Sequence, residues 1–122
     1  MSTETKPYDA AAPQPTPTGD GIDVAVVAAE RLKALGLNEI ADDIEARIRL
    51  GERKYGTRLK AFNGREPLMD LYQEVLDGIN YSQQCVIEGL DPQSNFFNVL
   101  VSLAIGIQKA IEAEACKKST SV

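Results

Sequence analysis

Histidine and tryptophan are absent from this chain of 122 residues, and cysteine occurs only twice. The lack of histidine removes the side chain that most often acts as a base near neutral pH. It also removes the commonest nitrogen ligand of zinc, so a metal site would be built from oxygen ligands, which favours magnesium or manganese. The two distant cysteines, Cys85 and Cys116, form no disulfide framework and indicate a reduced, cytoplasmic protein.

Leucine, isoleucine and valine are missing from the first twenty residues, which hold four of the six prolines. A segment of this composition cannot bury enough apolar surface to offset the entropy lost on ordering. It also lacks the basic start and the apolar run of a secretory signal. We therefore predict a disordered arm over residues 1–20, a single helical domain over residues 21–118 and a disordered tail over residues 119–122.

Alternating strand patterns are absent too, whereas four segments show helical periodicity. These segments cover residues 22–35, 38–55, 67–88 and 95–117. The connection between the second and third segments contains the turn-forming pair Asn63–Gly64, and Pro67 suits the first position of a helix. The sequence thus predicts an all-α fold, a compact bundle of about four helices.

The last predicted helix is apolar on two faces, with Phe96 and Leu103 on one face and Phe97 and Val101 on the other. A helix that is apolar nearly all round is buried nearly all round. Its apolar run falls short of the roughly 20 residues that a membrane span needs, so we expect no membrane partner. We predict instead a homo-oligomer that assembles through this helix; the alternative is a bundle that covers the helix fully.

Positive charge is scarce in a chain whose formal net charge is -5, yet it is concentrated in residues 51–67. This window holds five of the thirteen basic residues, namely Arg53, Lys54, Arg58, Lys60 and Arg65. Arginine matches the geometry of phosphate oxygens, and Tyr55 and Phe62 are able to stack on a base. The window therefore either binds phosphate or neutralises nearby acidic residues. The overall acidity argues against nucleic acid as a partner of the whole surface.

A strip of polar side chains follows the basic window on the third predicted helix. Its members are spaced i, i+4, i+7 and i+11 and line one side of the helix: Asp70, Glu74, Asp77 and Tyr81. Glu74 and Asp77 are close enough to share a divalent cation. The second helix adds Asp42 and Glu45. The alternative is an ordinary solvated face that binds nothing.

Several of these motifs resemble those of the MazG-like, all-α nucleotide pyrophosphohydrolases and of small phage and prophage proteins similar to them. The match covers about residues 39–88: K-Y-G at residues 54–56, N-G-R at residues 63–65, and E-x-x-D at Glu74 and Asp77. Asp42-x-x-Glu45 stands where that family has its first acidic motif. The resemblance implies a helical bundle that holds magnesium on a nucleoside triphosphate, in the cytoplasm of an infected or lysogenic bacterial host.

This resemblance also assigns roles to individual residues. Glu45, Glu74 and Asp77 become candidate catalytic residues, and together with Asp42 they would hold magnesium. The candidate ligand- and phosphate-binding residues are Arg53, Lys54, Tyr55, Arg58, Lys60, Asn63, Arg65 and Tyr81. The implied reaction converts a nucleoside triphosphate into a monophosphate and pyrophosphate.

Two other functions stay open at this point. A non-catalytic protein would sequester a phosphorylated nucleotide, for example a cyclic nucleotide immune signal, in a basic pocket between subunits. It would need the arginines and the aromatic residues but no metal. A plain oligomeric interaction module would need neither and would assemble through the last helix.

Overall fold

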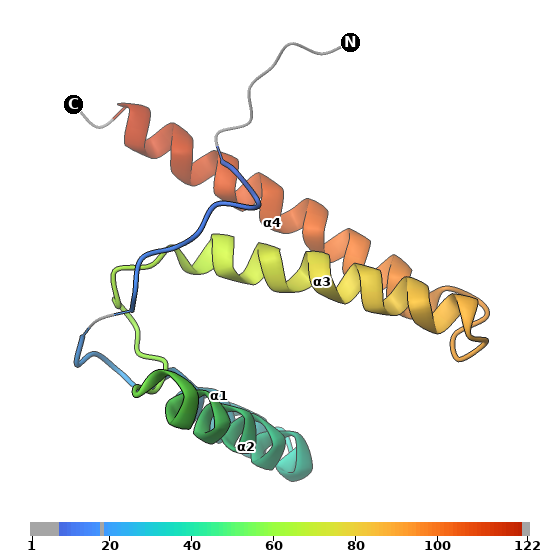
Figure 1. The fold of residues 1–122 in the computed structure, drawn as a ribbon, viewed down its shortest axis with the longest axis horizontal. Coiled ribbons are helices and arrows are strands. Elements are labelled where there is room, and N and C mark those ends of the chain that lie inside the picture. Colours follow the sequence, from blue (N-terminus) through green and yellow to red (C-terminus); the bar gives the residue numbers. More distant parts are fainter. Residues whose placement is uncertain (1–7, 18, 121–122) are drawn as a thin grey trace. The chain divides into compact units, whose positions relative to one another are not determined.

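Four helices contain most of the residues that the computed structural model describes, which are residues 8–17 and 19–120 (Figure 1). They are α1 (Val24–Ala34), α2 (Asn38–Tyr55), α3 (Pro67–Ile87) and α4 (Asn95–Thr120). No β-strand occurs within the described residues. The predicted all-α fold class and its four helices are confirmed, and the observed helix ends differ from the predicted ones by at most three residues.

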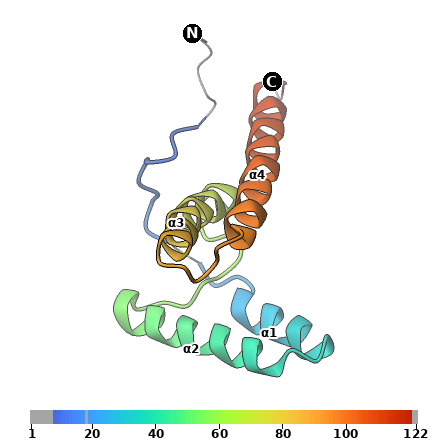
Figure 2. The ribbon, with the colours of Figure 1, turned by 90° about the vertical axis from the view of Figure 1, so that its right-hand side faces the viewer.

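The chain divides into two compact units, each built on a pair of helices that pack against each other. One unit, here called the α3–α4 unit, contains these two helices and the chain up to Gln14. The other, the α1–α2 unit, spans Pro15–Arg65. Figure 2 shows α1 and α2 lying side by side. The boundary between the two units after residue 65 falls inside the segment 21–118, which the sequence predicts as one domain.

The α1–α2 unit begins with Asp23, whose carboxylate accepts a hydrogen bond from the backbone N–H of Val26 at 3.2 Å and so caps α1. Ala25 and Ala41 are the buried residues of the two helices, and their small side chains let the helices approach closely. α2 ends at Gly56, which adopts the left-handed conformation that favours glycine, with φ of 77°.

The connection after α2 turns back beside the beginning of α1. Val24 donates a backbone hydrogen bond to Leu59 at 3.1 Å, and Ala61 donates one to Ile22 at 2.8 Å. Gly21 lies so close to Ala61 that a Cβ atom at this position would collide with the Ala61 carbonyl oxygen. The start of α1 and the connection are therefore held together by their backbones.

The α3–α4 unit has a core contributed equally by its two helices. α3 provides Met69, Tyr72 and Val75, and α4 provides Ala104, Ile107 and Ile111, all of them buried.

The turn between the two helices is fixed by Asp91, whose buried side chain is only 5% exposed. Its carboxylate accepts hydrogen bonds from the backbone N–H groups of Asn95 and Phe96, at 3.1 and 2.8 Å. These bonds satisfy two of the donors that the first turn of a helix leaves without intrahelical partners.

Residues 8–14 pack on the α3–α4 unit, which differs from the predicted disordered arm. The rings of Tyr8 and Tyr72 meet edge to face, with centroids 5.5 Å apart, and Gln108 donates to both hydroxyls at 3.0 Å. Gln73 donates to the carbonyls of Ala10 and Ala12, at 2.8 and 3.2 Å. One aromatic anchor and a set of amide side chains thus hold a segment that has no large aliphatic residue. The rest of the predicted arm before Tyr8, and residues 121 and 122 of the predicted tail, lie outside the described residues.

α4 is long and apolar enough to cross a membrane by length and composition alone, over Asn95–Lys118, with a mean hydropathy of 1.4. We predicted that its apolar run is too short for a span, but the helix continues to Thr120 and its few polar residues leave the mean hydropathy high. Only 17% of its most apolar stretch is buried. The same length and composition also suit a helix whose apolar faces pack against protein.

Glycine substitutions test the contact that holds the connection to α1. We expect Gly21→Ala to lower the free energy of unfolding of the α1–α2 unit by about 1–3 kcal/mol, because its Cβ collides with backbone. The control is Gly51→Ala in the interior of α2, where an added Cβ meets nothing within 4 Å. That change should raise stability by about 1 kcal/mol through helix propensity. Urea unfolding followed by circular dichroism measures both; equal effects of the two variants would contradict the close contact.

Candidate functional site

Arg58 is the centre of an ion-pair cluster in the α1–α2 unit. Its Nε lies 2.6 Å from Oδ2 of Asp23, and its Nη1 lies 3.0 Å from Oε1 of Glu45. Nη2 of Arg58 also donates to Oε2 of Glu45 at 3.1 Å. Lys60 and Arg49 extend the cluster, each with a nitrogen 3.6 Å from a carboxylate oxygen of Asp23 and Glu45 respectively. The cluster joins the connection to the beginning of α1 and to the middle of α2.

The proximity of opposite charges shifts the pKa values of the cluster. Hydrogen bonding to Arg58, opposed by partial burial and assisted by the N–H of Val26, lowers the pKa of Asp23 from 3.8 to about 2. Hydrogen bonding to Arg58 also lowers the pKa of Glu45. The two carboxylates in turn raise the pKa of Arg58. All three groups therefore stay ionised at neutral pH.

The cluster shows what two members of the basic window contact within the folded unit. The side chain of Arg58 is only 17% exposed and its guanidinium is shared by two carboxylates, while Lys60 lies beside Asp23. Both residues compensate acidic neighbours in the folded unit. This is the second of the two interpretations, in which the basic window neutralises local negative charge.

Asn63 and Arg65 shape the last turn of the connection. The side chain of Asn63 is buried, and its Oδ1 accepts a hydrogen bond from the backbone N–H of Arg65 at 3.1 Å. Nη1 of Arg65 donates to the carbonyl of Pro15 at 2.8 Å. In the neighbouring unit, Gln14 and Glu66 exchange two hydrogen bonds of 3.0 and 3.1 Å. The chain passes from one unit to the other after Gln14 and again after Arg65. Hydrogen bonds join the two chain segments on each side of this boundary, between Gln14 and Glu66 in one unit and between Arg65 and Pro15 in the other.

The remaining members of the basic window lie at the exposed end of α2. Arg53, Lys54 and Tyr55 are all exposed, and the ammonium of Lys54 lies 5.1 Å from the centroid of the Tyr55 ring. Phe62 in the connection is 96% exposed and has φ of 54°. These side chains are therefore accessible to a ligand.

The four candidate magnesium ligands are divided between the units. Asp42 and Glu45 belong to α2, whereas Glu74 and Asp77 are exposed on α3, with Tyr81 one turn further along. Among residues 8–17 and 19–120, no three acidic or cysteine side chains gather as a group that could hold a metal ion. Within one unit the structure therefore brings together only pairs of the predicted ligands.

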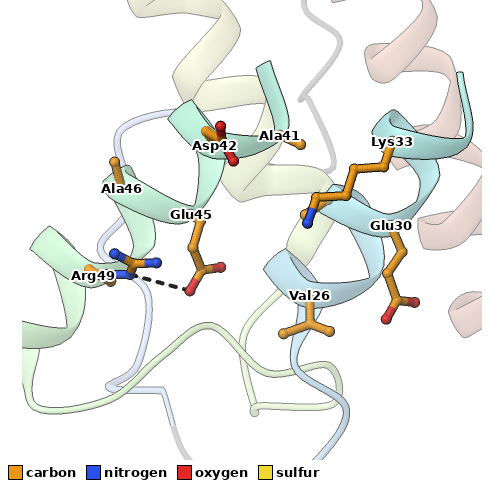
Figure 3. A pocket seen from close by; sticks show the side chains of 9 residues that line it. Val26, Glu30, Lys33, Ala41, Asp42, Glu45, Ala46 and Arg49 are labelled. Carbon is orange, nitrogen blue, oxygen red and sulfur yellow. Dashed lines mark ion pairs between the residues drawn. The ribbon is translucent and has the colours of Figure 1, made fainter. Parts of the chain in front are cut away.

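A groove of about 470 Å³ lies between α1 and α2 and contains the first acidic pair. Its charged residues come from both helices, and small residues leave the space between them: Glu30, Lys33, Asp42, Glu45 and Arg49, with Val26, Ala29, Ala41 and Ala46. In Figure 3 the amine of Lys33 reaches from α1 toward α2, and Glu45 is joined to Arg49.

Sequence reasoning selected Asp42 and Glu45 but missed Lys33, Glu30 and Arg49. The missed residues show no motif, because each is an ordinary charged residue on a helix. The available signal was the set of alanines on the facing sides of α1 and α2, which creates space beside those charges. No family model, curated protein or solved structure matches this chain. The groove is accordingly characterised by its own side chains: two cations beside three carboxylates, a set able to bind a ligand that carries both negative charge and hydrogen-bond donors.

Acid should destabilise the α1–α2 unit through Asp23. Because the folded state holds the pKa of Asp23 at about 2, below the ordinary value of 3.8, its stabilising contribution is complete above about pH 4 and disappears as the pH falls toward 2. Asp23→Asn should flatten this part of the pH profile, and it keeps a good helix cap because asparagine also suits that position. Asp43→Asn, an exposed change on α2, is the matched control. Thermal unfolding between pH 2 and 6 checks this, and parallel profiles for the two variants would contradict the Asp23–Arg58 pairing.

Proposed function

We propose that this chain binds a phosphorylated nucleoside in the groove between α1 and α2. The observation that carries the proposal is the presence of Lys33 and Arg49 beside the acidic pair Asp42 and Glu45, around a hollow of about 470 Å³. A volume of this size is within the range of small-molecule sites, which runs from about 300 to 1,000 Å³.

Arg58 does not line the groove, but its contacts with Glu45 leave the positive charge of Arg49 available to a ligand. Glu45 is hydrogen bonded to Arg58 at 3.0 and 3.1 Å, while its contact with Arg49 is longer, at 3.6 Å, and leaves the Arg49 side chain 67% exposed. Because Arg58 makes the shorter contacts with Glu45, Arg49 remains able to attract an anion. Lys33 supplies a second cation from the opposite helix. Together they offer a point charge and a planar fork to phosphate oxygens.

The remaining carboxylates suit the other half of a nucleotide. The carboxylates of Asp42 and Glu30 line the groove and are able to accept hydrogen bonds, and a nucleoside presents donors in its ribose hydroxyls and in the amino group of some bases. Inorganic phosphate would be repelled by these carboxylates because both carry negative charge. The mixture of charges therefore favours a phosphorylated nucleoside over inorganic phosphate.

Binding without turnover is the form of this function that the groove supports best. The residues of the groove do not by themselves fit magnesium, because the described residues contain no group of three such ligands. We assign no chemical step to a metal here. Under the resemblance, the ligand in the cytoplasm of an infected or lysogenic host would include a cyclic nucleotide immune signal, which such a protein would sequester.

Hydrolysis is the second candidate, and one observation favours it. Glu74 and Asp77 are both exposed on α3, three residues apart, which leaves their carboxylates available to a cation. In the MazG-like interpretation they would serve with Asp42 and Glu45.

Binding is tested by removing the two cations one at a time. Lys33→Met and Arg49→Met should each weaken the binding of a nucleotide about tenfold or more, because each removes a charge-assisted contact. The control is Arg47→Met, which removes an exposed charge from the same helix but not from the groove. Calorimetric titration against a panel of mono-, di- and cyclic nucleotides measures the affinities. An equal loss in all three variants, or no binding by the unchanged protein, would exclude the groove as the site.

Turnover is tested on the same samples with and without magnesium. We expect the nucleotide to be recovered intact by chromatography after denaturation, and we expect Glu74→Gln to leave its affinity unchanged. Release of pyrophosphate in magnesium that stops with Glu74→Gln would replace the binding proposal by the hydrolytic one.

A further inference from the structure

α4 has two apolar faces, and only one of them is covered within the α3–α4 unit. The covered face contains Ala104, Ile107 and Ile111, which pack against α3. The other face begins with Phe96, Val99 and Leu103, which are 60%, 67% and 44% exposed. These two faces lie about 100° apart around the helix. An exposed row of large apolar side chains at helical spacing indicates a contact with another helix.

The uncovered face continues along the helix with small residues. Its members follow the alternating spacing of three and four that is typical of a helix–helix seam. We call this set the outer stripe: Phe96, Val99, Leu103, Gly106, Ala110 and Ala113. The first half of the stripe is large and the second half is small. At Gly106 an added Cβ would meet nothing within 4 Å, so this position of the small half faces open space.

We propose that the outer stripe packs antiparallel against the outer stripe of a second copy of this chain. A twofold axis between Leu103 and Gly106 then places each large residue opposite a small residue of the second copy. Phe96 lies opposite Ala113, Val99 opposite Ala110, and Leu103 opposite Gly106. Every layer pairs one large and one small side chain, so two straight helices keep a constant separation along the seam.

A parallel arrangement of the same stripe has no such match. It would place Phe96 against Phe96 at one end and Gly106 against Gly106 further along. The first contact holds the helices apart, and the second leaves a void between them, which costs stability. The order of sizes along α4 therefore selects the antiparallel pair.

Charge along the edges of the seam is compatible with this pairing. In the antiparallel register, Lys109 lies opposite Ser102 of the second copy on one edge of the seam, whereas the other edge borders the face that packs against α3. Lys109 is exposed, so its ammonium reaches water while its apolar stem lies along the seam. No two like charges meet along the stripe.

The seam covers about five helical turns, from Phe96 to Ala113. A seam of this length buries less surface than a standard protein–protein interface, which covers about 800 Å² on each partner. We therefore expect a reversible dimer with a dissociation constant of about micromolar, and a monomer at high dilution.

The pairing is tested by exchanging the large and the small residue of the central layer. Gly106→Leu alone places leucine opposite leucine and should weaken self-association at least tenfold, although leucine favours the helix more than glycine does. Leu103→Gly alone leaves a gap and should weaken it similarly. The double variant L103G/G106L restores one leucine opposite one glycine in each central layer, so it should recover the dimer to within about threefold. Sedimentation velocity of the full chain over a range of concentrations measures all four proteins, and circular dichroism confirms that each is folded.

Direction is tested separately by disulfide formation. In a background with Cys85→Ser and Cys116→Ser, a mixture of Leu103→Cys and Gly106→Cys proteins should form the mixed disulfide on mild oxidation. Preferential 103-to-103 dimers would show a parallel pair and overturn the proposal.

Other occupants of the stripe give different results. A wild-type protein that stays monomeric up to hundreds of micromolar overturns the proposal. If the protein instead binds vesicles of neutral phosphatidylcholine through α4, the stripe faces lipid. If cysteine at position 103 resists alkylation in a monomeric protein, the α1–α2 unit of the same chain covers the stripe. A double variant that fails to recover association while both single variants lose it would also contradict the antiparallel pairing.

Discussion

The ion pairs of Arg58 are the interaction on which the α1–α2 unit depends. One guanidinium binds the carboxylate that caps α1 and the carboxylate in the middle of α2, so three segments distant in sequence are held together. The unit has few buried residues, with Ala25 and Ala41 as its only buried helical positions among those described. With so little apolar burial, the relative placement of the two helices and the connection rests on these charged hydrogen bonds and on the backbone contacts at Gly21. Removing one partner would leave the others as partly buried charges, which is why such clusters act as a whole.

The same cluster connects stability with binding. Glu45 faces the groove but is compensated by Arg58 from outside the groove lining, so folding has already determined how much negative charge a ligand meets there. The lowered pKa of Glu45 keeps that arrangement unchanged across the neutral range. Arg58, which the sequence predicts to bind phosphate, thus compensates the negative charge of Asp23 and Glu45 in the structure. Its influence on a bound anion would be exerted through Glu45 and Arg49.

The sequence predicted those features that depend on local signals. The start of α2 was predicted at Asn38 because asparagine suits an N-cap, but in the structure Leu37 holds the cap position without a side-chain hydrogen bond. The end of α2 followed from Gly56, and the start of α3 followed from Pro67. Features that depend on distant partners were not predicted. The packing of Tyr8 requires Tyr72 and Gln108, which lie 64 and 100 residues further along the chain. Asp23, one of the two partners of Arg58, lies 35 residues before it. The groove requires alanines on two helices to face each other, and composition alone does not reveal facing positions.

The three motifs that carry the family resemblance differ in the structural role that their residues have in the fold. Gly56 in K-Y-G terminates α2 in a left-handed conformation, which is a requirement of folding. Asn63 and Arg65 in N-G-R close a turn and bind the carbonyl of Pro15, where the chain enters the α1–α2 unit. Both pieces are therefore explained by the fold, whatever the protein binds. Glu74 and Asp77 lie exposed on α3, outside the core and away from both helix ends. Like charges at this spacing oppose helix formation slightly, so neither the core nor the helix caps accounts for this motif, and it remains a prediction of the sequence.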